Sequence, residues 1–436
     1  MLKALLFFDL LYVVNELHFH WETGIPAVAP INLLMLVTVL VMRGKPDILP
    51  DDVTGVARKS LFWFGYALIF AFLISEARSA ERFIEDLTFL KNGLFYPLFY
   101  FLYLRCRQDE KTTRQLIIWV LIIAAVAGVE GFHEGLDYGF GHYSAFKRAS
   151  GPFGADWHNA NRAGVFYGMF MPMFVAIALF LRGAILWRIG ALGAIVALAG
   201  GTIATYSRQS YFLVLLSFTL LLLRKSIIVA VLIGAALVSA VSYLPESVTQ
   251  RVEETEQTNN TAHGEVDTST ASRWEIWQAA MHMWRDNPLG VGFHKFSYEI
   301  GNYSGEYKGY DAHNFYVRTL AECGPFGLIT LLLLMRTLFR LASFIRRNVS
   351  PEDHETRALA YGFTIATLCM ALGGVYGTPT LEGAVMAPYW ALCGLLERYT
   401  HLKLLGRETV VEAVPVEPSI VERFPLAAYM LPGRRS

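Results

Sequence analysis

Residues 163–181 read AGVFYGMFMPMFVAIALFL, an apolar stretch that contains no charged side chain. A helix needs about 20 mostly apolar residues to cross the hydrocarbon core of a bilayer, so this stretch predicts a transmembrane helix. Because similar runs recur along the whole chain, the sequence predicts an all-α polytopic membrane protein. The predicted helices, about twelve of them, lie near 4–20, 27–42, 60–76, 87–104, 115–132, 163–181, 186–205, 209–223, 226–244, 314–335, 358–376 and 380–396.

The composition of the chain agrees with a membrane protein. Of its 436 residues, 54% are hydrophobic and only 17% are charged, whereas soluble domains carry about 25% charged residues. Lys and Arg together number 37, as do Asp and Glu, so the formal net charge is zero. Nucleic-acid-binding proteins normally carry a basic surplus or patch, and this balance argues against that class.

The positions of Lys and Arg predict how the chain is oriented. Basic residues gather in alternate connections between the predicted helices, and the other connections are mostly acidic. The positive-inside rule places the basic connections in the cytoplasm, and an even number of helices then places both termini there. The basic connections contain Arg43, Lys45, Arg58, Lys59, Arg105, Arg107, Lys111, Arg114, Arg182, Arg188, Arg224, Lys225, Arg336, Arg340, Arg346, Arg347 and Arg357.

Two of the predicted outer connections are long, and long loops usually have a function. The larger one is predicted to contain an amphipathic helix that begins at Ser272-Arg273-Trp274-Glu275, a capping box, and ends at Asp286-Asn287-Pro288. Its apolar stripe suits either the lipid headgroup layer or packing against the transmembrane bundle. The stripe consists of Trp274, Trp277, Met281 and Trp284. The chain is predicted to fall into four parts. Residues 1–244 form transmembrane helices and include an outer loop near 133–162, and residues 245–313 form the large outer loop. Residues 314–400 form further transmembrane helices, and residues 401–436 form a cytoplasmic tail.

Two arginines on the outer side are candidates for binding an anion. Arg273 would stand in the first turn of the amphipathic helix, where free backbone N–H groups and the macrodipole favour phosphate. Arg208 lies in the polar segment Tyr206-Ser207-Arg208-Gln209-Ser210, between two strongly apolar runs. The ordinary interpretations are a solvated surface side chain for Arg273 and a snorkelling anchor for Arg208.

A histidine lies where the helix at 314–335 is predicted to begin. His313 belongs to the segment Asp311-Ala312-His313-Asn314. A helix N-terminus disfavours the imidazolium, so this ring is predicted to be neutral and able to accept a proton. Asp311 would either cap the helix or orient the ring. A structural role for the histidine is the alternative.

Other polar residues give weaker signals. Lys147 and Arg148 form a basic pair near the outer face, where they can meet an anionic headgroup. Glu382, in a tight turn, is predicted to be solvated. Turn formation is the default interpretation of the group that contains Asp156, His158, Asn159, Asn161 and Arg162.

Metal and nucleotide sites are not predicted. Glu16, His18, His20 and Glu22 cluster without a zinc or calcium spacing. The four cysteines form no CxxC pair, which indicates neither a disulfide framework nor a zinc site; they are Cys106, Cys323, Cys369 and Cys393. A nucleotide-binding Gly-rich Lys motif and a GxSxG nucleophile motif are also missing, so ATP-driven work is unsupported.

Three motifs in this order resemble the O-antigen ligase and polymerase superfamily, and O-antigen ligases most closely. The resemblance is best from about residue 150 to 330, and it implies a glycosyltransferase C-type fold. The motifs are Ser207-Arg208; Arg273 with Trp277, Ala280 and Pro288-Leu289-Gly290-Val291-Gly292; and His313-Asn314 followed by Gly324-Pro325-Phe326-Gly327-Leu328.

The resemblance implies a glycosyltransferase of the bacterial inner membrane. Such an enzyme moves a glycan from undecaprenyl diphosphate to the lipid A-core oligosaccharide on the periplasmic face, among membrane lipids and without a metal or other cofactor. Arg208 and Arg273 would hold the diphosphate leaving group, and His313 would take the proton of the acceptor hydroxyl. A base opposite a leaving group favours a single displacement with inversion. Further candidates for substrate binding are Lys147, Arg148, Arg162, Asp311 and Asn314.

Other functions remain open at the level of sequence. An O-antigen polymerase would use the same residues on two lipid-linked glycans. A protein O-oligosaccharyltransferase is a further relative, although members of that branch tend to carry a larger C-terminal extension. A lipid-linked oligosaccharide flippase or solute transporter would place charged residues at mid-membrane. Here the unusual polar residues gather on the outer face, which favours a periplasmic enzyme, and Asp9 is the clear charge inside an apolar run.

Overall fold

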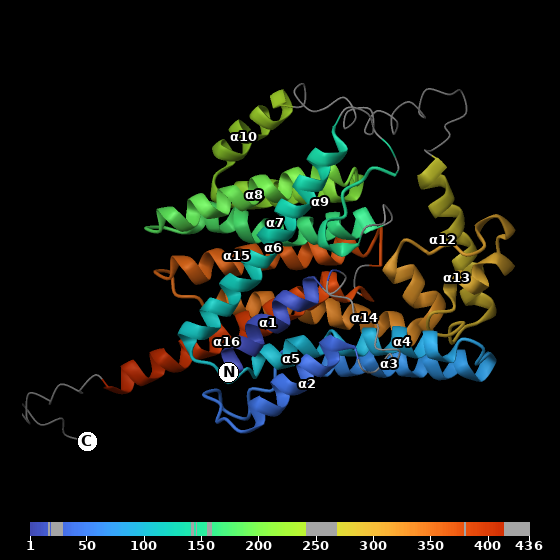
Figure 1. Cartoon of the computed structure of the whole chain (residues 1–436), viewed down its shortest axis with the longest axis horizontal. Helices are drawn as coiled ribbons and strands as arrows, with labels where there is room; N and C mark the ends of the chain where they lie inside the picture. Colours follow the sequence, from blue (N-terminus) through green and yellow to red (C-terminus); the bar gives the residue numbers. More distant parts are fainter. Residues whose placement is uncertain are drawn as a thin grey trace, which may run out of the picture.

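The computed structural model describes residues 1–15, 18, 29–140, 144, 146–154, 159–240, 268–378 and 381–413. Within these residues the regular elements are helices, most of which run side by side in one bundle, with α12 and α13 beside one of its ends (Figure 1). The α-helices are α1 (Leu2–Val14), α2 (Pro30–Arg43), α3 (Arg58–Arg78), α4 (Phe83–Phe95), α5 (Leu98–Leu104), α6 (Glu110–Tyr138), α7 (Ala160–Phe180), α8 (Ile185–Ala204), α9 (Arg208–Lys225), α10 (Ile227–Ala240), α12 (Thr268–Asp286), α13 (Phe296–Glu299), α14 (Phe315–Arg347), α15 (His354–Gly373) and α16 (Gly383–Ala413).

A helix lies at each predicted transmembrane run. The run at 87–104 is divided between α4 and α5 at Pro97, because proline has no N–H to donate within a helix. Among the described residues, six helices are long and apolar enough to cross a membrane: α3, α6, α7, α8, α14 and α15. These are the properties of a polytopic membrane protein. The number of crossings and the C-type fold stay predictions.

The last helix is longer than its apolar run. α16 continues to Ala413, whereas the run predicts an end near residue 396. Glu397 and Arg398, which follow that run, are buried and have partners inside the bundle instead of marking its edge. Residues 414–436 of the predicted tail and 241–267 of the predicted large loop lie outside the described residues.

Among the six helices that are long and apolar enough to cross a membrane, α7 is the most deeply buried. It contacts α8, α9 and α15, and nearly every residue from Ala163 to Ala176 is shielded from solvent. Gly362 of α15 allows one of these contacts, because a Cβ there would lie 2.8 Å from the Cα of Met173. Small residues at such crossings let two helix backbones approach closely. α7 thereby fixes the helices whose ends form the candidate site.

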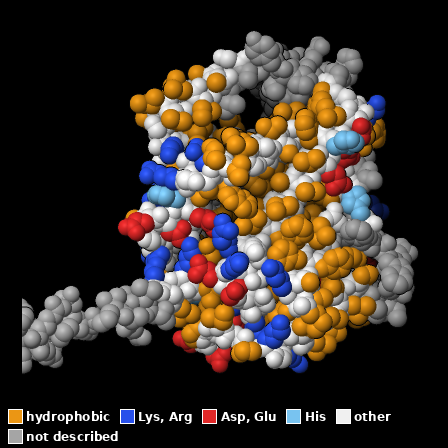
Figure 2. Space-filling view, turned by 60° about the vertical axis from the view of Figure 1, so that its left-hand side comes forward, with side chains coloured by type: hydrophobic (Ala, Val, Ile, Leu, Met, Phe, Trp, Pro, Cys, Tyr) orange, Lys and Arg blue, Asp and Glu red, His pale blue; other side chains and the backbone are white. Residues whose placement is uncertain are grey.

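Apolar side chains cover much of the surface between the two ends of the bundle (Figure 2). On α8, for example, Leu186 is 79% exposed and Val196 is 64% exposed. Soluble monomers seldom expose large contiguous apolar patches, because such surface is costly in water. A surface of this kind suits contact with lipid chains.

The helices alternate in direction, so their connections gather at two ends. At one end, the N–H of Val56 before α3 donates to Glu397 of α16 (2.8 Å). At the other end, the N–H of Phe293 donates to the carbonyl of Ala71 in α3 (3.0 Å). We call the first the Arg398 end and the second the His313 end. α12 and α13 lie at the His313 end, on the right of Figure 1.

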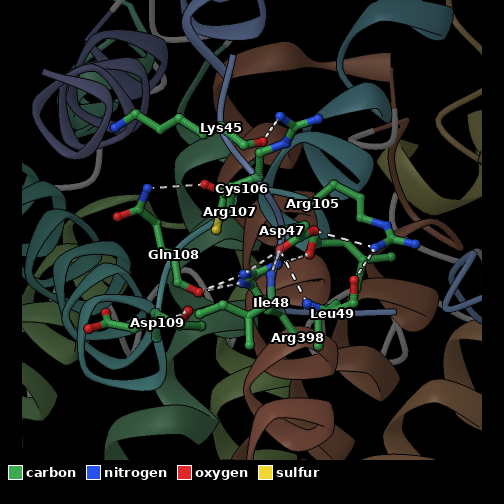
Figure 3. A network of polar contacts seen from close by, with 12 residues as sticks. Lys45, Asp47, Ile48, Leu49, Arg105, Cys106, Arg107, Gln108, Asp109 and Arg398 are labelled. Atoms are coloured by element: carbon green, nitrogen blue, oxygen red, sulfur yellow. Dashed lines mark hydrogen bonds and ion pairs between the residues drawn. The ribbon is translucent and has the colours of Figure 1, made fainter. Parts of the chain in front are cut away.

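Arginine side chains hold the Arg398 end together (Figure 3). The guanidinium of Arg398 is fully buried and donates to the carbonyls of Leu104 (2.9 Å) and Gln108 (2.6 Å) and to the carboxylate of Asp47 (2.8 Å). Arg105 joins Asp47 as well, at 3.3 Å. Burial raises the pKa of Asp47, but hydrogen bonding and charge from Arg398 outweigh burial and hold that pKa below its usual value.

Two neighbouring arginines, Arg105 and Arg107, also bind short stretches of backbone. Arg105 donates to a turn before α3, and Arg107 donates to the end of α2. The accepting carbonyls belong to Leu49, Pro50, Asp51 and Val53 for Arg105, and to Met42, Arg43 and Lys45 for Arg107. Each guanidinium thus supplies hydrogen-bond donors to backbone carbonyls that have no partner in a regular helix.

Candidate functional site

The starts of α9 and α14 meet at the end of α15. Gln209, the second residue of α9, donates from Nε2 to the carbonyl of Gly373 (2.7 Å). The N–H of Phe315, the first residue of α14, donates to the carbonyl of Gly374 (2.7 Å). Arg208 is adjacent to Gln209 in sequence. Two helices that are far apart along the chain therefore bring the predicted arginine and histidine segments to one place.

Arg273 lies in the same region. Its guanidinium carbon is 5.8 Å from the ring centroid of Tyr376, just past the end of α15. Burial is the main cause that lowers the pKa of the His313 imidazole, and the positive charge of Arg273 adds to this shift. One turn along α12, the indole N–H of Trp277 donates to the carbonyl of Ala312 (2.8 Å). α12 is therefore fastened to the segment that carries the histidine.

The predicted start of α12 is wrong. The helix begins at Thr268, so Ser272 is not its N-cap and Arg273 is not in its first turn. Glu275 does not close a capping box, because its carboxylate accepts the hydroxyl of Tyr307 (2.5 Å). The free N–H groups of a helix terminus consequently do not contribute at Arg273. The predicted end at Asp286 is confirmed.

The buried face of α12 differs from the predicted tryptophan stripe. The residues that pack against the bundle are Ile276, Ala279, Ala280 and Met283. Trp277 packs partly against them, whereas Trp274 is 61% exposed. Within the predicted stripe, Trp277 therefore packs against the protein, whereas Trp274 is exposed.

His313 is half-buried and has a left-handed backbone, with φ of 49°. This conformation is uncommon for a residue with a Cβ and is held here by its neighbours. Its N–H donates to Asp311 (3.3 Å), whose carboxylate also accepts Thr378 Oγ1 (3.4 Å). Burial lowers the pKa of His313; Asp311 opposes this shift and Arg273 adds to it. Burial, rather than the helix terminus named in the prediction, is the main cause that favours the neutral ring.

Asp311 does not cap α14. The N-cap is Asn314, whose side-chain oxygen accepts the N–H groups of Tyr316 (3.0 Å) and Val317 (3.1 Å). The interpretation of Asp311 as the cap is therefore wrong. Asn314, one of the predicted substrate-binding residues, is the cap, and its amide oxygen is occupied by these two N–H groups. Asp311 is instead ion-paired with Arg318 in the first turns of the same helix (3.1 Å).

Arg318 and Glu322 form a buried ion pair that sequence analysis missed. Nε of Arg318 is 3.1 Å from Oε1 of Glu322, which is only 2% exposed. The same oxygen accepts the N–H of Phe296 at the start of α13 (3.1 Å). An Arg and a Glu four residues apart in an otherwise apolar run were the available signal, since charges in such a run need partners. The pair connects the segment of Asp311 to α13.

The glycine motif packs against a kink in α14. The N–H of Gly292 donates to the carbonyl of Glu322 (3.0 Å). Gly324 has φ of 64°, directly before Pro325, so the helix bends there. A Cβ on Gly290 would lie 2.6 Å from the carbonyl carbon of Glu322 and 2.8 Å from the backbone N of Gly324. These glycines are required for close packing of backbone beside the site.

Glu382 is part of this region rather than a fully solvated turn residue. Its carboxylate is 2.9 Å from Arg162 in the first turn of α7. Burial raises the pKa of Glu382, and the charges of Arg162 and Arg318 partly offset this shift. The side chain is 31% exposed, so the prediction of a solvated residue holds only in part, because the starts of α7, α14 and α16 come together around it. Arg162, predicted as a substrate-binding residue, lies here.

Arg148 is buried and holds protein atoms. Its Nε donates to the carbonyl of Thr205 (2.8 Å) and its Nη2 to Asn161 (2.6 Å). It therefore fixes the segment that leads to Arg208. Lys147 next to it is exposed. The basic pair predicted from the sequence thus has two different environments.

Among the described residues, no group of three or more His, Cys, Asp or Glu side chains is placed to hold a metal ion. From the acidic and histidine cluster near the N-terminus, His18 is 2.9 Å from Glu130. The other members of that cluster, Glu16, His20 and Glu22, lie outside the described residues. Asp156 and His158 lie outside them as well.

Residues 193–332 match a protein-family model described as O-Antigen ligase. No curated protein matches the chain. The matched segment extends from α8 into α14 and contains Arg208, Arg273 and His313. This segment is therefore similar to O-antigen ligases, which confirms the resemblance found in the motifs. Members of this family are glycosyltransferase-like enzymes that act on lipid-linked glycans.

Proposed function

We propose that the protein transfers a glycan from undecaprenyl diphosphate to the lipid A-core oligosaccharide at the periplasmic face of the inner membrane. The observation that carries this proposal is that the segments of Arg208, Arg273 and His313 meet around the end of α15. All three lie inside the segment that matches the O-antigen ligase family. Their chemistry matches the three needs of the reaction, which are an anion site, charge stabilisation and a base.

The two arginines bind the diphosphate in this proposal. A guanidinium presents two parallel N–H donors to a phosphate and stays charged at every physiological pH. When the bond between the anomeric carbon and the diphosphate oxygen breaks, negative charge develops on that oxygen. Stabilising such charge is usually the largest single contribution to catalysis. Because the donor already contains an activated bond, no nucleotide is needed.

His313 serves as the general base. Burial keeps its ring neutral near pH 7, so the ring can take the proton of the acceptor hydroxyl. As that proton leaves, the acceptor oxygen forms a bond to the anomeric carbon and the diphosphate departs from the opposite face. The electron pair of the broken bond stays on the diphosphate. One displacement of this kind inverts the anomeric configuration.

Asp311 and Arg318 position the base. The carboxylate of Asp311 accepts the N–H of His313 and is itself held by Arg318 (3.1 Å). A left-handed residue costs about 1–3 kcal/mol and persists only where its surroundings define it. These contacts hold the strained backbone of His313 in place, and Asp311 acts through His313 rather than on the substrate.

The charge distribution supports the proposed orientation. α1 begins at the Arg398 end, where Lys3 donates to Gln115 of α6 (2.6 Å), and α16 ends there. Arg105, Arg107 and Arg398 belong to the same end. The positive-inside rule then assigns the Arg398 end to the cytoplasm and the His313 end to the periplasm.

Purified protein given a lipid-linked glycan, with and without lipid A-core, tests the proposal. We expect glycan-capped core, and we expect His313→Ala to reduce its rate by about 10²–10⁴-fold, the usual contribution of a general base. His282→Ala, on the exposed side of α12, is the matched control and should retain the rate. Longer lipid-linked chains would indicate a polymerase, and the lack of either product would favour a transporter.

A further inference from the structure

Three aromatic side chains form a row beside His313. The ring centroid of Trp277 is 6.1 Å from that of Trp274 and 6.4 Å from that of Tyr376. The middle ring is fixed, because its indole N–H donates to the carbonyl of Ala312 (2.8 Å). We call Trp274, Trp277 and Tyr376 the aromatic row. It connects α12 to the segment that follows α15.

The outer rings of the row, Trp274 and Tyr376, do not belong to the packed face of α12. The helix already buries Ile276, Ala280 and Met283 against its neighbours. At the two ends of the row, Trp274 is 61% exposed and Tyr376 is 46% exposed. Large rings with open faces outside the core of a protein are typical of binding surfaces.

The neighbours of the row indicate what it binds. The guanidinium of Arg273 lies against Tyr376, at 5.8 Å from the ring centroid, so the row adjoins the proposed diphosphate site. A pyranose ring presents a face of C–H groups, which stack on the electron-rich face of an aromatic ring. Its edges carry hydroxyl groups, which hydrogen-bond to polar and charged side chains. A saccharide joined to a diphosphate would place its sugar rings on the aromatic row and its diphosphate at the neighbouring arginine.

We propose that the aromatic row binds sugar rings of a saccharide substrate beside the reacting centre. This inference rests on the proposed function and adds the part of the substrate that the arginines and His313 do not contact. Both the donor glycan and the core oligosaccharide have this chemistry. The length of each one can be varied separately, which distinguishes the two sources.

The kinetic test compares Trp274→Ala and Tyr376→Ala with Tyr310→Ala, an exposed tyrosine of the same end outside the row. Each is assayed with a diphosphate donor that carries one sugar or many, and with a short or complete core acceptor. An aromatic stacking contact is worth about threefold to tenfold in affinity. We expect the row variants to raise KM by about that factor more for the long form of one substrate than for its short form. Tyr310→Ala should not change this ratio.

The substrate whose length governs the loss is the one that the row binds. Equal losses with short and long forms of both substrates would mean that the rings serve folding or lipid anchoring, and would overturn the proposal. No loss would overturn it as well. Trp274→Phe, which retains a ring, should restore most of the KM ratio, and failure of this rescue would also count against stacking.

A binding measurement separates this inference from the proposed transfer. The oligosaccharide released from the donor, without lipid or diphosphate, is added to detergent-solubilised protein and tryptophan fluorescence is followed. A saturable change that is lost in Trp274→Ala supports the row even if the wild type transfers no glycan. If transfer is normal and the free oligosaccharide gives no saturable change and no length dependence, the proposed function stands and the row proposal fails.

Discussion

Arginines at the two ends of the bundle have different partners. At the Arg398 end, guanidinium groups donate mostly to backbone carbonyls, and Arg398 itself is fully buried. At the His313 end, the buried Arg148 also donates to a backbone carbonyl. Two other arginines of this end differ: Arg162 pairs with the carboxylate of Glu382 and remains 45% exposed, and Arg273 lies over an aromatic ring. Backbone carbonyls are fixed, whereas carboxylates and rings can rearrange around a ligand. A buried arginine on backbone is thus a structural feature, and a half-exposed arginine on side chains is a candidate for binding.

Backbone strain is distributed unevenly between the same two ends. Among the described residues, the non-glycine residues with positive φ are Arg107, Tyr206, His294 and His313. Arg107 belongs to the Arg398 end, where its own guanidinium binds the neighbouring backbone. Tyr206 and His313 closely precede the first residues of α9 and α14 at the other end. Strain of this kind concentrates at functional sites, where surrounding contacts maintain it.

The largest effect on stability is expected from Arg398→Ala. The change leaves the carboxylate of Asp47 without its main partner in a buried network, which costs about 3–5 kcal/mol of the free energy of unfolding. Arg407→Ala, on the exposed part of the same helix, is the control. Thermal unfolding in detergent measures both variants. A melting temperature equal to that of the wild type in Arg398→Ala would contradict a structural role for this end.

The largest effect on rate among the arginines is expected from Arg208→Lys and Arg273→Lys. Lysine keeps the charge but cannot bind two phosphate oxygens in parallel, and the loss of one donor to a developing anion costs about 10²–10³-fold in kcat. Thermal unfolding of these variants should remain near that of the wild type. Wild-type turnover in either variant would exclude that arginine from the diphosphate site.

The helices could be predicted because their signal is local. The run at 163–181 contains no charge and coincides almost completely with α7, which extends from Ala160 to Phe180. That the segments of Arg208, Arg273 and His313 act together could be inferred only through the family resemblance, because no local pattern relates residues so far apart. Local signals gave a wrong prediction where a tertiary contact competed with the local hydrogen bond. Tyr307 took the carboxylate of Glu275, and the capping box did not form.

The ion pairs of the site could not be predicted from the sequence. Glu382 pairs with Arg162, which lies more than half the chain away, and only the packing of α7 against the other helices brings them together. Asp311 could be assigned two roles from its position, and its real partner, Arg318, was overlooked inside an apolar run. Sequence spacing indicates which residues share a helix face, but it does not indicate which helix ends meet.

A smaller effect, on the pH dependence of the rate, is expected from Asp311→Asn. The base must be neutral, so the rate falls as the pH drops through the pKa of His313. Burial lowers that pKa, Arg273 lowers it further and Asp311 raises it. Removal of the carboxylate therefore lowers the pKa again and moves the acidic limb of the kcat profile to lower pH. Arg318 and Glu382 lie close to Asp311, so Glu382→Gln should be profiled in parallel.

A purely structural role for Asp311 predicts a different result. The rate would then fall by the same factor at every pH, and the acidic limb would stay in place. A shift toward higher pH would contradict the sign of the electrostatic effect. Asp311→Glu keeps the charge and is the matched control, for which the limb should remain at its wild-type position.

The smallest effect is expected from Glu382→Gln. Arg162 is 45% exposed, and an ion pair of this exposure contributes about 0–1 kcal/mol to the free energy of unfolding. Since Arg162 is a candidate for substrate binding, release of its partner should change KM for the donor more than kcat. Steady-state kinetics and thermal unfolding measure the two effects together. A destabilisation as large as that of Arg398→Ala would show that the His313 end is also built as a structural network, and would remove the difference between the two ends.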